Sequence, residues 1–429
     1  MLLGLWDVNP DTTNADGRTP LLWAAAYGHE GMVEVLLERA DVDPDRKDKY
    51  GQTPLIRAIW AGDERVAKML LELGGVNPNA ANHGGRTPLD IAAYGGHGGI
   101  VKMLLDWINV NPNTMNQQGE TPLFVAARKG REKVVKALLE RMDVNPNTAD
   151  ICGKTPLYIA AKEGHEGVVK ILLGRNDVNP NTVNQYGQTP LFVAAWEGHE
   201  GVVKTLLERV DVNPNAVNQN DQAPLYIAAH GGHGGVVKML LDRNDVNLNT
   251  MNQFGQTPLF IAAWKGRERV VKTLLERVDV NPNTADKYGR APLYIAAKEG
   301  HEGVVKTLLD RNDVNPNTVN QYGETPLFVA ARDGHERVVK TLLGRVDINP
   351  NTADKYGQVP LDRAARAGHE GVVKMLLERA DVGLNTANND VQPPLSRVVG
   401  VPLERNDANI HTANQYNRTL LFTAAWKGD

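Results

Sequence analysis

Residues 189–209 read TPLFVAAWEGHEGVVKTLLER, and near-copies of this stretch recur along almost the whole chain of 429 residues. The Thr-Pro-Leu position falls at 19, 53, 87, 121, 155, 189, 223, 257, 291, 325 and 359, so the step between copies is constant. We number these copies as repeats one to eleven. A fixed period of this size indicates a repeat architecture in which each unit stacks on its neighbours.

Each copy encodes two short helices. Thr189 stands before Pro190, and a capping threonine followed by proline at the first helical position predicts a helix start. Gly198 supplies the left-handed residue that ends this helix. A second helix over residues 202–207 (VVKTLL) carries an apolar stripe at helical period.

An extended segment and a turn complete the unit. Residues 211–215 read DVNPN, and the proline there prevents a helix. A turn such as 184–187 (NQYG) leads into the next copy, with glycine last. One unit cannot bury its own apolar face, so stacked copies must share a continuous core.

The Thr-Pro-Leu, Ala-Ala, Gly-His and Val-Val-Lys-x-Leu-Leu motifs, followed by Asp-Val-Asn, resemble the ankyrin repeat. This resemblance implies an all-α solenoid of stacked helix-turn-helix units with extended, turn-containing loops. Ankyrin repeats have a period of about 33 residues. The step in this chain is one residue longer, and we expect the extra residue in the Asp-Val-Asn-Pro-Asn loop. The tetratricopeptide repeat has a similar length, but its Trp, Gly and Tyr spacing is absent here. Long, near-identical arrays of this kind also resemble those of filamentous fungi.

The regular array is expected over residues 1–388, with a partial repeat at 1–18. Residues 389–418 predict a degraded, shortened repeat, and residues 419–429 the first helix of a truncated one. Both ends are abrupt, so we expect an excerpt of a longer array. Residues 157–180 recur almost unchanged at 293–316, which indicates that a block of four repeats was duplicated.

Composition limits the function classes. The chain has 47 Lys and Arg against 51 Asp and Glu, a net charge of −4, which argues against a nucleic-acid binder. It contains one cysteine and no apolar run long enough to span a bilayer. We therefore expect an intracellular location, cytoplasmic or nuclear, without membrane insertion.

The histidines invite a metal or acid–base interpretation. Eight of the eleven stand at one position of the unit: His29, His97, His165, His199, His233, His301, His335 and His369. Metal ligands must converge on one point, whereas these are spread along the array, and Asp63, Arg131 and Arg267 replace three of them. We expect each histidine to satisfy backbone groups in the turn between helices.

No catalytic constellation is recognisable. The segment 95–99 (GGHGG) lacks the Lys-Ser/Thr of a phosphate-binding loop. Serine and cysteine nucleophiles lack a plausible base. Most of the lysines at one position of the second helices have an acid four residues on, as in Lys136 with Glu140, which predicts a neutralised face. We predict no enzyme, metal, cofactor, nucleic-acid ligand or small-molecule substrate.

The variable positions are more informative. The resemblance implies that partner proteins are held on a concave face formed by turn tips and first helices. The expected contact residues at the turn tips are Tyr50, Tyr186, Phe254, Tyr288, Tyr322 and Tyr356. Those on the first helices are Trp60, Tyr94, Arg128, Lys162, Trp196, Trp264, Lys298, Arg332 and Arg366.

Two aromatic series have an alternative explanation. The tip tyrosines could instead pack along the neighbouring turn and stiffen the array. The series directly after Thr-Pro-Leu is expected to pack between repeats: Phe124, Tyr158, Phe192, Tyr226, Phe260, Tyr294 and Phe328. For Trp196 and Trp264 binding is favoured, because an exposed tryptophan is costly without a purpose.

The sequence thus predicts a protein–protein interaction scaffold. One alternative is a sensing or autoinhibitory arm of a larger signalling protein whose effector domain lies outside this chain. This alternative rests on the abrupt ends and on the fungal resemblance, since such fungal arrays often follow a nucleotide-dependent switch domain. A passive elastic tether is a third interpretation.

Overall fold

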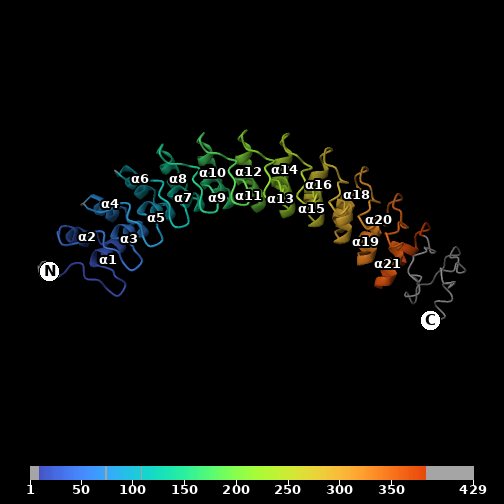
Figure 1. Cartoon of the computed structure of the whole chain (residues 1–429), viewed down its shortest axis with the longest axis horizontal. Helices are drawn as coiled ribbons and strands as arrows, with labels where there is room; N and C mark the ends of the chain where they lie inside the picture. Colours follow the sequence, from blue (N-terminus) through green and yellow to red (C-terminus); the bar gives the residue numbers. More distant parts are fainter. Residues whose placement is uncertain (1–8, 73–74, 108, 383–429) are drawn as a thin grey trace. The chain divides into compact units, whose positions relative to one another are not determined.

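The computed structural model describes residues 9–72, 75–107 and 109–382. These residues form α-helices and no β-strand, which confirms the all-α prediction. The chain divides into two compact units, residues 1–219 and 220–429, and each is described by itself (Figure 1). The predicted degraded repeat at 389–418 and the truncated helix at 419–429 lie outside the described residues.

Every repeat from one to eleven contributes a helix pair. In the first unit, the first helices are α1 (Pro20–Ala26), α3 (Pro54–Ala61), α5 (Pro88–Gly95), α7 (Pro122–Arg128), α9 (Pro156–Lys162) and α11 (Pro190–Glu197). The second helices are α2 (Glu30–Leu37), α4 (Glu64–Glu72), α6 (Gly98–Asp106), α8 (Glu132–Leu139), α10 (Glu166–Leu173) and α12 (Glu200–Leu207).

The second unit repeats this pattern. Its first helices are α13 (Pro224–Gly231), α15 (Pro258–Trp264), α17 (Pro292–Lys298), α19 (Pro326–Asp333) and α21 (Pro360–Ala367). Its second helices are α14 (Gly234–Leu241), α16 (Glu268–Leu275), α18 (Glu302–Leu309), α20 (Glu336–Leu343) and α22 (Glu370–Leu377).

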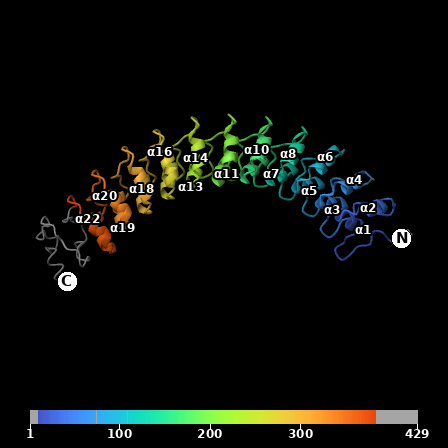
Figure 2. The same cartoon turned by 180° about the vertical axis from the view of Figure 1, so that it is seen from behind.

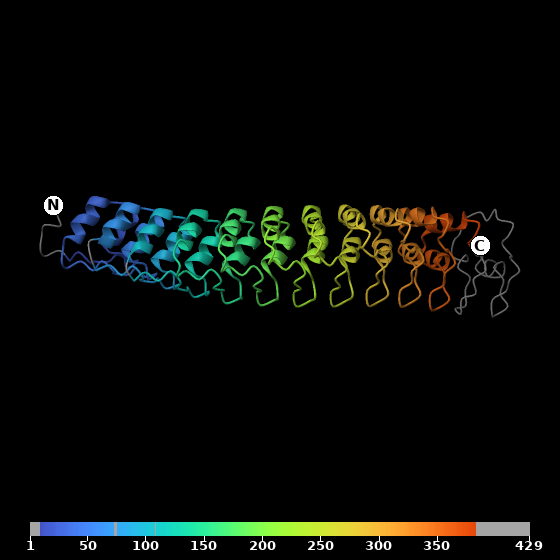
Figure 3. The same cartoon turned by 90° about the horizontal axis from the view of Figure 1, so that it is seen from above.

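The helices form two layers within each unit. Each first helix contacts the first helix of the next repeat, and each second helix contacts the next second helix (Figures 1 and 2). The connecting loops extend from one side of these layers (Figure 3). The core therefore runs along the unit instead of gathering at a centre, as expected for a solenoid.

The local signals read from the sequence set the helix ends. The Thr189 hydroxyl accepts a hydrogen bond from the Phe192 N–H at 3.1 Å. Gly198 ends α11 with φ at 78°, in the left-handed region. Ala194 and Ala195 are fully buried, and a methyl side chain lets neighbouring first helices approach closely. The predicted start, end and core face of the first helix are confirmed.

The Asp-Val-Asn-Pro-Asn loop contains an asparagine ladder. Asn147 donates from Nδ2 to the Asp177 carbonyl at 2.7 Å, and its Oδ1 accepts the Asn179 N–H at 3.0 Å. Asn181 makes the same two bonds one repeat later, to the Asp211 carbonyl and from the Asn213 N–H. One side chain thus satisfies two backbone groups of the following loop, which gives this loop a direct role in repeat stacking.

The aromatic series after Thr-Pro-Leu is buried between repeats, as predicted. Phe124, Phe192, Phe260 and Phe328 are among the largest fully buried side chains. The Tyr158 hydroxyl donates to Gln188 Oε1 at 3.1 Å and accepts from Asn184 Nδ2 at 3.0 Å, both in the next repeat. Burial raises the pKa of Tyr158 to about 12, so the hydroxyl keeps its proton.

Candidate binding face

The turn tips and the C-terminal ends of the first helices form one face of each unit, which we call the tip face. The residues predicted at the turn tips are all exposed: Tyr50, Tyr186, Phe254, Tyr288, Tyr322 and Tyr356. Of those predicted on the first helices, Trp60, Trp196 and Arg366 are exposed. Half-buried are Tyr94, Arg128, Lys162, Trp264, Lys298 and Arg332.

Backbone hydrogen bonds fix the turn tips against one another. Within the first unit, the Gln185 N–H donates to the Cys152 carbonyl at 3.0 Å, and the Gln219 N–H donates to the Tyr186 carbonyl at 3.0 Å. Gly187 has φ at 74° and lets the chain reverse within each tip. The tip side chains are therefore displayed on a backbone whose neighbouring turns are linked.

Lysine side chains lie beside several tip aromatics in the second unit. Lys287 Nζ lies 4.2 Å from the Phe254 ring centroid and 5.1 Å from that of Tyr288. Lys355 lies 4.3 Å and 5.0 Å from the rings of Tyr322 and Tyr356. Cation–π contacts of this kind stiffen neighbouring tips, and the rings keep exposed surface as well. Both interpretations of the tip aromatics are therefore compatible with the geometry.

The tryptophans predicted for binding differ in their surroundings. Trp196 is 46% exposed and packs one side against Phe192, with ring centroids 6.2 Å apart. Trp264 is half-buried, and the guanidinium of Arg290 lies 5.9 Å from its ring centroid. Trp60 meets the Tyr94 ring of the next repeat edge-on at 5.7 Å. Trp196 therefore presents the most indole surface among these three.

Two predicted arginines are engaged within the fold. Arg332 donates to Glu324 Oε1 at 2.7 Å, and Glu324 also accepts the Tyr294 hydroxyl at 2.8 Å. Arg128 forms the corresponding ion pair with Glu120. Both glutamates are buried. Because a buried carboxylate needs a compensating charge, these arginines first serve the stability of the repeats.

Three predicted residues come together in a cleft between repeats five and six. Lys162, Tyr186 and Trp196 line it with Lys154 and Glu197, and its volume is about 210 Å³. The hydrogen-bonded group of Tyr158, Asn184 and Gln188 also belongs to its lining. The other predicted contact residues lie outside this cleft.

Sequence reasoning did not single out Lys154 or Gln188. Each precedes the Thr-Pro-Leu position of its repeat, and the equivalent residue elsewhere is glutamate at 120 and 324 and arginine at 290. This position varies in charge among otherwise similar copies, a signal that was present in the sequence. Whether the charge at this position is neutralised depends on the residue eight positions later in the chain. The fold brings the two side chains together, as in Glu324 and Arg332.

Five histidines of the series lie at hydrogen-bond distance from a backbone carbonyl, as predicted, but from one in the preceding repeat: His165, His199, His301, His335 and His369. His165 Nε2 lies 3.0 Å from the Arg128 carbonyl oxygen, and His301 Nε2 lies 3.0 Å from that of Trp264. Arg131 makes the same kind of contact, because its Nε donates to the Tyr94 carbonyl at 3.3 Å. This explains why arginine can replace histidine at this position.

The predicted neutralisation of the lysine series is wrong in detail. Of the lysine–acid pairs four residues apart in the described part of the chain, only Lys68 and Glu72 form an ion pair, at 3.6 Å. Ion pairs occur instead in the turns after the second helices, where Arg209 Nε donates to Asp211 Oδ1 at 2.8 Å. An arginine held two residues from its acid is better oriented than a flexible lysine.

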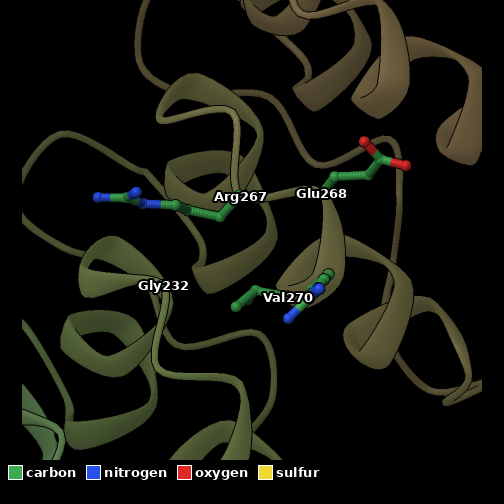
Figure 4. Close-up of a pocket in the computed structure, with 5 residues that line it drawn as sticks. Gly232, Arg267, Glu268 and Val270 are labelled. Carbon is green, nitrogen blue, oxygen red and sulfur yellow. The ribbon is translucent and has the colours of Figure 1, made fainter.

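A second hollow, of about 380 Å³, lies in the second unit at the start of α16. Figure 4 shows Arg267 extending toward Gly232 while Glu268 points away from it. Arg267 Nε donates to the His230 carbonyl at 3.3 Å. Open walls and one engaged arginine give this hollow no catalytic geometry.

In residues 9–72, 75–107 and 109–382, no group of three or more His, Cys, Asp or Glu side chains is placed to hold a metal ion. None of the helices there is both long and apolar enough to cross a bilayer.

The sequence was compared with known protein families. The family model described as ankyrin repeats (3 copies) matches residues 1–82, 72–150, 142–218, 209–286, 225–320 and 293–386. Together these matches span most of the chain. The search of curated proteins returned no match.

Proposed function

Since this chain belongs to the ankyrin repeat family, whose repeats are generally protein–protein interaction modules, we propose that it is a scaffold that binds partner proteins on its tip face. Ankyrin folds are typically non-catalytic, which agrees with this proposal. A sensing or autoinhibitory arm of a larger signalling protein, the alternative drawn from the sequence, would use the same face.

The observation that carries the proposal is the exposed indole of Trp196 in the cleft between repeats five and six. It is 46% exposed beside Lys162 and Tyr186. Tryptophan and tyrosine are the residues that most often dominate binding energy at protein interfaces. Tyr186 stands on a turn tip that is hydrogen-bonded to the next, and Trp196 stands on α11, so little backbone entropy is lost on binding.

Partner capture tests this proposal. The complete chain and the Trp196→Ala/Trp264→Ala variant are immobilised, and captured proteins are identified by mass spectrometry. We expect unchanged helicity in the variant, because Trp196 is exposed and Trp264 is only half-buried, and clear loss of the captured partners. The matched control is Lys204→Ala/Lys272→Ala, which removes exposed side chains from α12 and α16. An identical set of partners on all three proteins would contradict the proposal.

A further inference from the structure

We propose that the cleft between repeats five and six binds an acidic peptide segment, in which a carboxylate side chain lies next to an aromatic or aliphatic one. This inference rests on the proposed function and specifies the chemistry of the partner. It is carried by the charges that line the cleft, by its size, and by its counterparts in other repeats.

Repeat five holds a lysine at each of two positions that the fold brings together. In repeats four and ten, the two positions hold Glu120 with Arg128 and Glu324 with Arg332, and each pair is an ion pair. In repeat five the same two positions hold Lys154 and Lys162. Two cations therefore stand where repeats four and ten form an ion pair.

These two lysines are also free of internal ion pairs among the described residues. In the part of the chain that the structure describes, neither Lys154 nor Lys162 forms an ion pair. Gln188, which reaches toward the same place, is uncharged and accepts the Tyr158 hydroxyl and the Asn184 amide with its one oxygen. Glu197 is the single acid of the lining, so the cleft keeps an excess of positive charge.

The volume of the cleft and its apolar wall fit a short peptide segment. A volume of about 210 Å³ is below the range of about 300–1,000 Å³ that is typical of small-molecule pockets. It suits one or two side chains of a bound segment. Trp196 and Tyr186 supply the apolar surface beside the ammonium groups, so an acidic residue next to an apolar one matches both parts.

The sequence of another repeat suggests a substitution that neutralises the charge of the cleft and preserves the fold. Gln188→Glu places beside the two lysines the same residue that repeat ten carries as Glu324. Glu324 accepts from the hydroxyl of Tyr294 and the amide of Asn320, as Gln188 does from Tyr158 and Asn184. We therefore expect the variant to fold and its new carboxylate to neutralise the lysine pair.

A matched control exists in repeat eight. Gln256 accepts the Tyr226 hydroxyl at 3.2 Å and the Asn252 amide at 3.0 Å, so Gln256→Glu makes the same chemical change. The positions equivalent to the lysine pair are Gln222 and His230. This control introduces a carboxylate into the same network without a lysine pair beside it.

The test uses a random peptide library displayed on phage and selected on the complete immobilised chain. Enriched peptides are synthesised, and their dissociation constants are measured by fluorescence anisotropy on the four proteins: unmodified chain, Gln188→Glu, Lys154→Gln/Lys162→Gln and Gln256→Glu. We expect enriched sequences with Asp or Glu next to an aromatic or aliphatic residue. Their affinity should fall about tenfold or more on both cleft variants, remain unchanged on Gln256→Glu, and weaken with added salt.

Several outcomes would overturn the inference. They are enrichment of neutral or basic peptides, enrichment of no peptide, or equal affinity on the unmodified chain and Gln188→Glu. These failures remain distinct from failure of the proposed function. If Trp196→Ala/Trp264→Ala loses captured proteins while Gln188→Glu keeps them, the tip face binds partners and the acidic preference is wrong.

Discussion

The cleft between repeats five and six and the corresponding place between repeats nine and ten are built on almost the same sequence, four repeats apart. In both, a buried tyrosine, Tyr158 or Tyr294, bonds to an asparagine of the next repeat. In the first place Gln188 and Trp196 stand at the two variable positions, and neither lysine of the cleft forms an ion pair in the described part of the chain. In the second, Glu324 and Arg332 form an ion pair.

This difference shows how a repeat array can acquire a binding site. The buried tyrosine and asparagine maintain the contact between neighbouring repeats. Residues at two variable positions decide whether charged side chains form an internal ion pair or remain available to a partner. Arg290, the counterpart of Lys154, is itself paired with Asp286 at 2.6 Å. Asp150, the counterpart of Asp286, forms no ion pair with Lys154 in the described part of the chain. A binding site can therefore arise where a charge is left without the ion pair that it forms in another repeat.

The largest expected effect concerns a feature that both places share. Gly198 and its counterpart Gly334 have φ at 78° and 76°. Gly198→Val and Gly334→Val should each destabilise the local repeat by about 2–4 kcal/mol, because a β-branched residue is strained in the left-handed region and must displace neighbours. At Gly334 an added Cβ would lie 2.6 Å from the His369 ring.

Amide hydrogen exchange measures this free energy of local opening separately in α11–α12 and α19–α20. An unchanged melting curve and unchanged exchange in either variant would show that the turn tolerates a side chain.

The next effect separates the two places. Glu324→Ala should lower the free energy of unfolding by about 2–3 kcal/mol, because Arg332, the Tyr294 hydroxyl and the Asn320 amide each lose a hydrogen bond to its buried carboxylate. Gln188→Ala should lower it by about 1 kcal/mol, since only neutral hydrogen bonds are lost. Urea denaturation of both variants measures the two losses. Equal losses would mean that the ion pair adds nothing to the network.

Asp90 is expected to make the stability of the chain depend on pH. Four repeats later the same position holds Tyr226. Asp90 is buried, its Oδ2 accepts the Thr87 N–H at 2.9 Å, and its Oδ1 has no partner. Burial, with a smaller contribution from Glu120, raises the pKa of Asp90 to about 6. The folded state therefore holds a proton that the unfolded chain releases near its ordinary value of 3.8.

The stabilising proton is fully present below about pH 4 and is lost as the pH rises to about 6 and above. Asp90→Asn should therefore raise stability by about 1–2 kcal/mol at pH 7.5 and change it little at pH 4. Thermal unfolding of both proteins across this range measures the difference. Parallel stability curves for the two proteins would refute a raised pKa at Asp90.

The smallest expected effect is on stability at the binding residue itself. Trp196→Ala should change the free energy of unfolding by less than about 1 kcal/mol, because the indole is already half exposed. Arg332→Ala, its counterpart, should cost more because Glu324 then loses its charged partner. A larger loss for Trp196→Ala than for Arg332→Ala would make Trp196 a packing residue.

Much of this fold followed from the sequence because its causes are local. The threonine cap, the left-handed glycine and the apolar stripe act within one repeat, and the constant period multiplies each signal. The face that carries the variable aromatics followed from the ankyrin resemblance. Contacts between repeats were harder to read, since His165 was expected to bond within its own turn and bonds the preceding repeat instead.

The site was less predictable because charge depends on partners that only the fold brings together. From sequence, Arg128 and Lys162 are equivalent contact residues. In the structure, Arg128 neutralises the buried Glu120, whereas Lys162 lines the same cleft as Lys154. This difference in charge compensation cannot be seen when each position is compared alone. It can be seen when the two positions are compared as a pair in every repeat.

Amide hydrogen exchange of the complete chain with and without a captured partner tests the central claim most directly. We expect binding to slow amide exchange in the turn tips and in the C-terminal ends of α9 and α11, around Lys154, Lys162 and Trp196. Amides on the exposed faces of α10 and α12 should exchange as before. Protection confined to the second helices, or no protection in repeats five and six, would contradict it.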